Sequence, residues 1–369
     1  MVPVNTPLLN GNEKKYLNEC IDTGWISSEG PFIKRFEDEM CSYIGRKYAT
    51  TCTSGTAALD IVVSSLHLQK DDEVIMPSFT IISCAQALVK QGVKPILVDS
   101  DIKTFNMIVE DIEAKITSKT KAIMIIHIFG LTVDIDPILE LAKKYNLKII
   151  EDAAQMIGQE YNGKKCGSFG DISIFSFYPN KQITTGEGGM VLCDDEELDK
   201  RAKSFRNLCF GDDRFIHEEL GYNYRMTNMQ AALGVAQLEQ INKIVEKKRW
   251  IGNTYNELLI NIKEITLPLA LTSYCENIYW VYAIMINDDC NKSAKNIMDE
   301  LGKLKIGTRP FFYPMHQQPV FNKMNLFNND NLPNSKKLYE KGFYIPSGMA
   351  LTKKQMIEVS EALHKVFGS

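Results

Sequence analysis

A lysine stands in a segment that suits covalent chemistry on a carbonyl group. Lys181 follows an apolar run that ends at Phe177, has no other cation nearby, and precedes the glycine-rich stretch Gly186–Gly189. A lysine amine must lose its proton before it can attack a carbonyl carbon, and partial burial favours that loss. Lys181 is therefore a candidate Schiff-base lysine, and the alternative is a solvated surface lysine.

An acidic residue and a glutamine follow another apolar run. Within Ile149–Gln155, Asp152 is expected at the carboxyl end of a parallel strand, where α/β folds place their ligands. Its carboxylate could hold a proton on a heteroaromatic nitrogen, and Gln155 could reach a neighbouring oxygen. The alternative is an acidic residue that only ends a strand.

Small polar residues within Cys52–Leu59 are typical of a helix start that binds an anion. Ser54, Gly55 and Thr56 would supply hydroxyl groups, free backbone N–H groups and the positive end of a helix dipole. The same residues could equally form an ordinary helix N-cap.

These segments must be positioned by elements that alternate between strand and helix. The strand-like runs are mostly apolar without strict alternation, which is expected when helices cover both faces of a sheet. They are Glu73–Pro77, Pro95–Asp99, Ala122–Ile126, Lys148–Asp152, Ile172–Ser176 and Met190–Cys193. The helix-length segments are Thr56–Leu68, Ile81–Gln91, Ile135–Tyr145 and Asp195–Arg206. This order predicts an α/β fold with a largely parallel central sheet.

The second half of the chain has a different pattern. One helical pattern without proline runs from Thr227 to Leu259 and could link a large domain to a smaller one. Beyond it we expect an α+β arrangement, with a strand at Tyr279–Ile286 and helices at Ser293–Leu304 and Lys353–Phe367. The sequence therefore predicts a large domain over residues 1–250 and a small C-terminal domain over residues 251–369.

Composition narrows the classes of partner. The 369 residues include 42 Lys and Arg against 46 Asp and Glu, a net charge of −4, and no dense basic tract, so a nucleic-acid or anionic-membrane partner is not expected. The most apolar stretch, Ala122–Leu131, is too short to span a bilayer, and the N-terminus does not resemble a signal peptide. The nine cysteines are scattered and form no C-x-x-C pair. We therefore expect a cytoplasmic protein with reduced thiols.

Several other motifs are incomplete. Gly158–Lys165 nearly matches a phosphate-binding P-loop, but Lys165 stands where a Ser or Thr should bind magnesium, so a turn between two strands is expected. Gly186–Gly189 lacks the third glycine of a dinucleotide fingerprint and precedes a strand. The five histidines show no zinc-ligand spacing, and we expect no metal.

Taken together, the segments around Lys181, Asp152 and Ser54 resemble the DegT/DnrJ/EryC1/StrS family of nucleotide-sugar aminotransferases. These are pyridoxal-phosphate enzymes of fold type I, the aspartate-aminotransferase-like fold, with a large mainly parallel-sheet domain and a smaller C-terminal α+β domain. The resemblance covers nearly the whole chain. It is also carried by Gly24–Pro31, Pro77–Thr80, His127–Gly130, Gly221–Asn228 and Arg309–His316.

The resemblance implies a role for each cofactor-binding position. Lys181 would bind pyridoxal 5'-phosphate covalently, Asp152 would pair with its pyridinium nitrogen, and Gln155 would hydrogen-bond its phenolic oxygen. Phe79 would stack on the ring face, unless it is simply a core residue. The phosphate would be held by Ser54, Gly55, Thr56 and Ser176.

The resemblance also implies partners. Asn223 would reach the cofactor phosphate of the neighbouring subunit in a homodimer whose active sites are shared, unless it is only a turn residue. The candidates for contacts near the nucleotide-sugar are Arg309, Tyr313 and His316. A guanidinium suits paired phosphate oxygens, but a structural arginine or a core histidine is an equal alternative.

The implied reaction is transamination from L-glutamate to a nucleotide-linked 4-keto-6-deoxy sugar, with Lys181 moving the proton. Related 3-dehydratases carry histidine where this chain has Lys181, so transamination is favoured over dehydration. The substrate implied first is GDP-4-keto-6-deoxy-D-mannose, aminated at C4, with a role in O-antigen or lipopolysaccharide synthesis. The alternatives are 3- or 4-amination of a dTDP- or UDP-linked sugar and a non-catalytic regulatory relative, against which Lys181, Asp152 and Gln155 together argue.

Overall fold

A seven-stranded sheet organises the first half of the chain. The computed structural model describes residues 1–213 and 215–368. Its large sheet has the strand order β1-β9-β8-β5-β4-β2-β3. These strands are β1 (Tyr48–Cys52), β2 (Glu73–Pro77), β3 (Lys94–Val98), β4 (Thr120–Ile126), β5 (Lys148–Asp152), β8 (Ile172–Ser176) and β9 (Gly189–Cys193). The five strands from β3 to β8 are parallel, and β9 runs antiparallel between β8 and β1, so the expected mainly parallel α/β sheet is confirmed.

Strand β1 has a polar sequence and was not predicted. Its threonines are buried all the same, because each hydroxyl has a carboxylate partner: Thr51 Oγ1 donates to Glu37 Oε1 at 2.8 Å, and Thr50 Oγ1 donates to Asp199 Oδ1 at 3.1 Å. These partners come from helices before and after the strand. A pattern based on apolar residues therefore could not find this strand.

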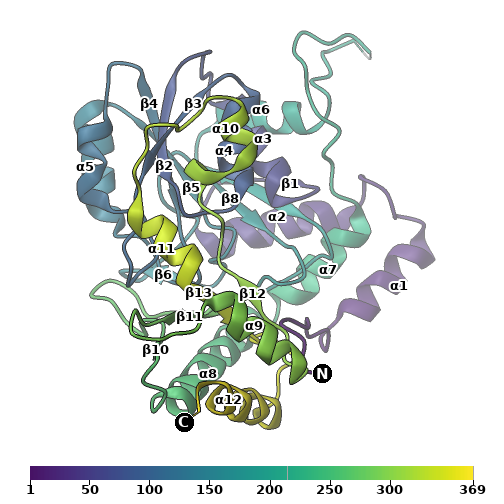
Figure 1. Cartoon of the computed structure of the whole chain (residues 1–369). Helices are drawn as coiled ribbons and strands as arrows, with labels where there is room; N and C mark the ends of the chain where they lie inside the picture. The colour runs from purple at the N-terminus through teal and green to yellow at the C-terminus, as the bar shows by residue number, and fades with distance from the viewer. Residues whose placement is uncertain (214, 369) are drawn as a thin grey trace.

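Helices cover both faces of the large sheet (Figure 1). The helices of this part of the chain are α1 (Glu13–Thr23), α2 (Pro31–Ile44), α3 (Gly55–Ser65), α4 (Ile82–Lys90), α5 (Ile135–Tyr145), α6 (Glu196–Arg206) and α7 (Asn228–Leu238). Helix α1 packs on α7 and not on the sheet itself. Alternate residues of β4 enter different cores: Met124 packs in the cluster that contains α3 and α4, whereas Ile123 and Ile125 pack with α5. This two-sided burial is the reason why the central strands are continuously apolar.

The helical pattern predicted over Thr227–Leu259 is two helices, α7 and α8 (Ile241–Leu259). Leu238 and Ile241 on either side of the break are both buried, so the apolar pattern continues across it. Between them, the Glu239 carboxylate accepts hydrogen bonds from Tyr16 at 2.6 Å and from Arg35 at 2.9 Å. The break therefore depends on tertiary contacts that no local pattern shows.

The second half builds a smaller antiparallel sheet of order β10-β11-β13-β12. Its strands are β10 (Ile265–Thr266), β11 (Tyr282–Ile286), β12 (Arg309–Pro310) and β13 (Gly342–Ile345). Its helices are α9 (Ala294–Lys303), α10 (Pro319–Lys323), α11 (Pro333–Lys341) and α12 (Lys353–Phe367). Helix α8 packs against this sheet, and Val2 joins the same core through a bridge to Ile306.

Short elements complete the fold. The P-loop-like segment forms a hairpin of β6 (Glu160–Tyr161) and β7 (Lys164–Lys165), with Asn162 and Gly163 at positive φ in its turn, as expected from the sequence. Single 3₁₀ turns occur at Val109–Asp111, Glu113–Lys115 and Met315–Gln317. In the two described ranges, no helix combines the length and the hydropathy needed to cross a membrane.

Candidate active site

A cavity of about 350 Å³ opens at the carboxyl ends of the parallel strands. Its walls include the ends of β4, β5 and β8, the start of α3, and residues from the second half of the chain such as Trp280 and Tyr344. This edge of the sheet is where ligands bind in α/β folds. The predicted site residues that line the cavity are Ser54, Gly55, Thr56, Asp152, Gln155, Ser176 and Lys181.

Lys181 follows β8 in a tight turn, with its backbone N–H bonded to the Tyr178 carbonyl at 2.8 Å. Its side chain keeps some exposure to the cavity but is otherwise surrounded by protein. Burial lowers the pKa of Lys181 to about 8, although the nearby Asp152 carboxylate acts in the opposite direction. A substantial fraction of the amine is therefore neutral near physiological pH, as nucleophilic attack requires.

Asp152 ends β5 and is almost completely buried. Its Oδ1 accepts a hydrogen bond from the Ala154 N–H at 3.0 Å, and its Oδ2 lies 3.2 Å from the Cys84 thiol, which donates to it. Burial raises the pKa of Asp152 above its usual value. A cationic N–H group in the cavity would therefore be a favourable partner for this carboxylate.

Gln155 is held so that only its amide nitrogen is left for a ligand. Its Oε1 accepts a hydrogen bond from the Phe129 N–H at 2.7 Å, and its backbone carbonyl accepts one from Gln182 Nε2 at 2.7 Å. Because the Phe129 N–H can only donate, the side-chain oxygen must face it. The Gln155 amide therefore suits an oxygen acceptor in the cavity.

The start of α3 faces the cavity with hydrogen-bond donors that suit an anion. Ser54 is the N-cap, and its hydroxyl accepts the Ala57 N–H at 3.1 Å. A Cβ atom on Gly55 would lie 2.8 Å from Ser176 Cβ, so only glycine allows this close approach of helix and strand. The free N–H groups of the first turn, with the hydroxyls of Thr56 and Ser176 on the cavity wall, provide donors for a phosphate.

Phe79, which is predicted to stack on a ligand ring, does not line the cavity in this structure. Phe79 is 0% exposed, because its ring packs in an aromatic cluster with Phe129, Phe311 and Phe312 at centroid distances of 5.8 to 5.9 Å. The cavity wall in this segment is formed instead by the two following residues, Thr80 and Ile81.

The three predicted substrate residues lie outside this cavity. Arg309 is exposed and borders a second cavity of about 240 Å³, which shares walls with the first. Tyr313 packs edge-on against Tyr339, and His316 Nδ1 lies 2.8 Å from Ser78 Oγ; neither lines either cavity. Burial lowers the pKa of His316.

Asn223 does not line the cavity of its own chain. Its side chain is exposed, and its Oδ1 accepts a hydrogen bond from Arg225 Nη2 at 2.7 Å. Its backbone forms an isolated bridge with Asn207.

Trp280 was not predicted, although it is central to the cavity. Lys181 Nζ lies 3.9 Å from the centroid of its ring, and its indole N–H donates to the Asn180 carbonyl at 2.8 Å. The only signal in the sequence was the rarity of tryptophan, which occurs three times. Trp280 reaches the site from a segment 99 residues beyond Lys181, so no local motif could include it.

Known proteins match the chain over nearly all of its length. GDP-perosamine synthase of Escherichia coli O157:H7 is 40% identical over 367 residues, covering 99% of this chain and 98% of the relative. GDP-perosamine synthase of Caulobacter vibrioides is 39% identical, with the same coverage of both chains.

Solved structures agree with these matches. The aminotransferase of Psychrobacter cryohalolentis superposes with a TM-score of 0.90 at 28% identity, covering 99% of both chains. Helicobacter pylori PseC, an aminotransferase involved in pseudoaminic acid biosynthesis, superposes with a TM-score of 0.93 at 26% identity, covering 100% of this chain and 99% of PseC. The profile of one family matches residues 7–364. The chain therefore belongs to the DegT/DnrJ/EryC1/StrS aminotransferase family, as its motifs predict.

Proposed function

We propose that this aminotransferase uses pyridoxal 5'-phosphate to transfer the amino group of L-glutamate to C4 of GDP-4-keto-6-deoxy-D-mannose, which makes it a GDP-perosamine synthase. The observation that carries the reaction is the convergence of a buried amine, a buried carboxylate and a helix N-terminus on one cavity. The choice of sugar is supported by the relatives named GDP-perosamine synthase, which match at 38 to 40% identity over nearly their whole length.

The side chains present fit this cofactor on chemical grounds. The ring nitrogen, once protonated, suits the buried Asp152 carboxylate, and the phenolic oxygen suits the amide of Gln155. The phosphate suits the first turn of α3, where Gly55 leaves room beside Ser176. The aldehyde requires an amine that loses its proton easily, and Lys181 is such an amine.

The protein contributes positioning and proton transfer. When bound, the cofactor supplies an electron sink for the carbon that loses its proton. Asp152 would hold a proton on the ring nitrogen of the bound cofactor, and Lys181 Nζ would be the base that takes the substrate proton and returns it. Trp280 and Phe312 form apolar walls that limit the access of water to this amine.

The second cavity is the proposed place for the diphosphate of the substrate. It adjoins the first through shared walls at Tyr178, Asn180, Trp280 and Tyr344, so one extended ligand could occupy both. Arg309 borders it with an exposed guanidinium, which suits paired phosphate oxygens. The structure gives no comparable support for Tyr313 or His316.

We also propose a homodimer with shared sites. Asn223 is exposed, and the same segment carries the exposed apolar side chains of Ile216 and Leu220, which suit an interface. Mixing the Asn223→Ala and Lys181→Ala chains tests this, because a hybrid dimer would contain one site with both native residues. We expect activity to recover on mixing. A mixture as inactive as its components would contradict an active site shared between subunits. A monomer that light scattering shows to be fully active would also contradict it.

Cytoplasmic location and a role in O-antigen or lipopolysaccharide synthesis belong to the same proposal. They are supported by the free state of all nine cysteines, which suits a reducing compartment, and by the perosamine-synthase relatives.

The deciding experiment follows the absorption spectrum of the purified chain with pyridoxal phosphate. L-glutamate should change the spectrum to that of the aminated cofactor, and the GDP-linked keto-sugar should restore it. If a dTDP- or UDP-linked keto-sugar restores the original spectrum and the GDP-linked sugar does not, the substrate carries that other nucleotide. A bound cofactor that never responds to L-glutamate would favour the regulatory alternative.

A further inference from the structure

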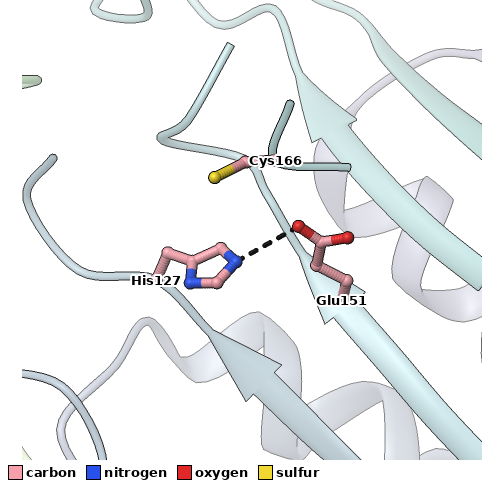
Figure 2. A group of neighbouring side chains, drawn as sticks. All are labelled: His127, Glu151 and Cys166. Carbon is pink, nitrogen blue, oxygen red and sulfur yellow. Dashed lines mark hydrogen bonds and ion pairs between the residues drawn. The ribbon is translucent and has the colours of Figure 1, made fainter. Parts of the chain in front are cut away.

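His127, Glu151 and Cys166 form a fully buried group of neighbouring side chains (Figure 2). His127 follows β4, Glu151 is the residue before Asp152 in β5, and Cys166 follows β7. Because successive side chains of a strand point to opposite faces, Glu151 points away from the face that Asp152 presents to the cavity. The group therefore lies behind the proposed cofactor site.

The hydrogen bonds define the state of the His127 ring. The Val133 N–H donates to Nδ1 at 3.2 Å, so Nδ1 is an acceptor and the ring proton is on Nε2. Nε2 lies 3.2 Å from Glu151 Oε1 and donates to it, as the dashed line in Figure 2 shows. Both ring nitrogens are thus occupied by protein partners, and neither is free to bind a metal ion.

Glu151 is equally occupied. Its Oε1 also accepts the Gly167 N–H at 2.5 Å, and its Oε2 accepts the Phe169 N–H at 2.8 Å. Three donors from two loops therefore surround one carboxylate at the end of β5. These hydrogen bonds hold the last residues of β5 against the two loops, and they leave no carboxylate oxygen free for a ligand.

The same pair also fixes the turn that follows β4. The turn runs from His127 to Val133 and is closed by the bond between the ring and the Val133 N–H. Within it, Phe129 adopts a positive φ of 57° and donates its N–H to Gln155. A residue other than glycine rarely adopts this conformation unless the surrounding structure holds it.

We propose that the buried Glu151–His127 pair is a positioning unit for two cofactor-contacting groups. Glu151 fixes the end of β5, from which Asp152 projects, and His127 fixes the turn whose Phe129 orients Gln155. The positioning is a property of this fold, and its catalytic consequence rests on the proposed function.

The first test uses the full chain without cofactor. In this form, the pH at which Lys181 becomes reactive reports the position of Asp152, because that carboxylate raises the pKa of Lys181. Reductive labelling of Lys181 with a small aldehyde, followed by mass spectrometry, measures this midpoint. Glu151→Gln places a side-chain amide N–H against a backbone N–H, so the end of β5 should shift and carry Asp152 away from Lys181. The pH midpoint of Lys181 labelling should then fall. A midpoint equal to that of the wild type would overturn the proposal.

A double-mutant cycle separates positioning from a general structural role. If Glu151 acts through Asp152, the chain with both Glu151→Gln and Asp152→Asn should have the same midpoint as Asp152→Asn alone. Additive shifts would contradict the proposal. Cofactor affinity is the second readout, and Glu151→Gln should weaken it about 10- to 100-fold, the size of effect that loss of a supporting hydrogen-bond partner has at metal sites.

Two further variants keep the test decisive if Glu151→Gln does not fold. His127→Gln retains a donor near Nε2 but removes the acceptor for the Val133 N–H. It should weaken cofactor binding through Gln155 and leave the Lys181 midpoint unchanged. Cys166→Ala is the matched control from the same group, and neither readout should change. A loss of cofactor affinity in Cys166→Ala as large as in His127→Gln would contradict the proposal.

The two proposals fail in distinguishable ways. If the wild-type chain binds no pyridoxal phosphate, the proposed function fails, whereas a lowered Lys181 midpoint in Glu151→Gln would still support the positioning unit. If the wild type turns over and Glu151→Gln matches it in midpoint and affinity, only the positioning unit fails.

Discussion

The Lys181 amine lies 3.9 Å from the centroid of the Trp280 ring, and the indole N–H of Trp280 is bonded to the carbonyl of the residue before that lysine. Two opposing effects meet in this contact. The π-face of the ring attracts the charged ammonium form, whereas burial by the same ring favours the neutral amine. Burial lowers the pKa of Lys181 to about 8, and we expect it to be the larger of the two effects.

The first prediction concerns the pH dependence of Lys181. Its amine should be half-deprotonated near pH 8 in the chain without cofactor, whereas an ordinary lysine amine reaches that point at about 10.5. Reductive labelling with a small aldehyde at a series of pH values measures the midpoint. Lys181→Ala should lose this fast-reacting site and all covalent cofactor binding. A midpoint above pH 10 would contradict the expected burial.

Replacement of Trp280 tests how its ring affects the pKa of Lys181. Trp280→Leu should admit water to the amine and raise the pH midpoint of Lys181 labelling above about 8. The reason is that the charged ammonium form is more stable when the amine is less buried. The chain offers a matched control, because Lys247 Nζ also lies 3.9 Å from a tryptophan ring, that of the half-exposed Trp250. Trp250→Leu should leave the Lys181 midpoint unchanged. A downward shift in Trp280→Leu would mean that the cation–π attraction is not outweighed by burial.

Asp152→Asn should act on two measurements in a defined direction. Because the Asp152 carboxylate raises the pKa of Lys181, its neutralisation should move the labelling midpoint below 8. Turnover with L-glutamate should fall by about 10²- to 10³-fold, the usual effect of losing one electrostatic partner of the reacting group. Turnover equal to the wild type would remove Asp152 from the site.

The residues that local sequence could predict are those that end strands or begin helices. Asp152 and Ser176 end strands, and Ser54 caps a helix, so their positions follow from the α/β pattern itself. Phe79 shows the limit of that reasoning: it is in the correct segment, but it faces the aromatic core instead of the cavity. Which of several neighbouring residues faces a ligand depends on packing that the segment alone does not determine.

The contributions from the second half of the chain depend wholly on tertiary structure. Trp280 and Tyr344 reach the cavity because the smaller sheet shares a hydrophobic core with the larger one, in which Met285 of β11 belongs to the same cluster as Met124 of β4. No spacing in the sequence relates these residues to Lys181. Asn223 is a different case, because its predicted contact is with a second subunit and no feature of a single chain tests it.

Gly55→Ala tests the anion site at the start of α3. The added Cβ would lie 2.8 Å from Ser176 Cβ, so the helix must move away from the strand and its N–H groups must leave the cavity. Cofactor affinity should fall by at least about tenfold, corresponding to one lost hydrogen bond to a charged group. Gly302→Ala in α9 is the control, because no atom outside its own helix lies within 4 Å of the added Cβ. It should leave cofactor affinity unchanged, and an equal loss in both variants would contradict a local effect.

The last prediction concerns Lys248, a buried lysine that donates to the backbone carbonyls of Trp280 at 2.9 Å and Ser347 at 2.6 Å. Burial lowers its pKa to about 7, against about 10.5 for an ordinary lysine. Between these two pH values the unfolded chain binds the additional proton, so the free energy of unfolding should rise with pH across this window.

Denaturant unfolding of the wild type and of Lys248→Met at pH 7, 8 and 9 checks this expectation. The difference in stability should increasingly favour the wild type as the pH rises, and Lys181 does not disturb the comparison because both chains retain it. A difference that is constant with pH would mean that Lys248 stays charged in the fold. A neutral amine is sufficient for the observed contacts, because its two hydrogens match the two carbonyls that face it. Lys248 can therefore hold the backbone of Trp280 over Lys181 without a buried charge.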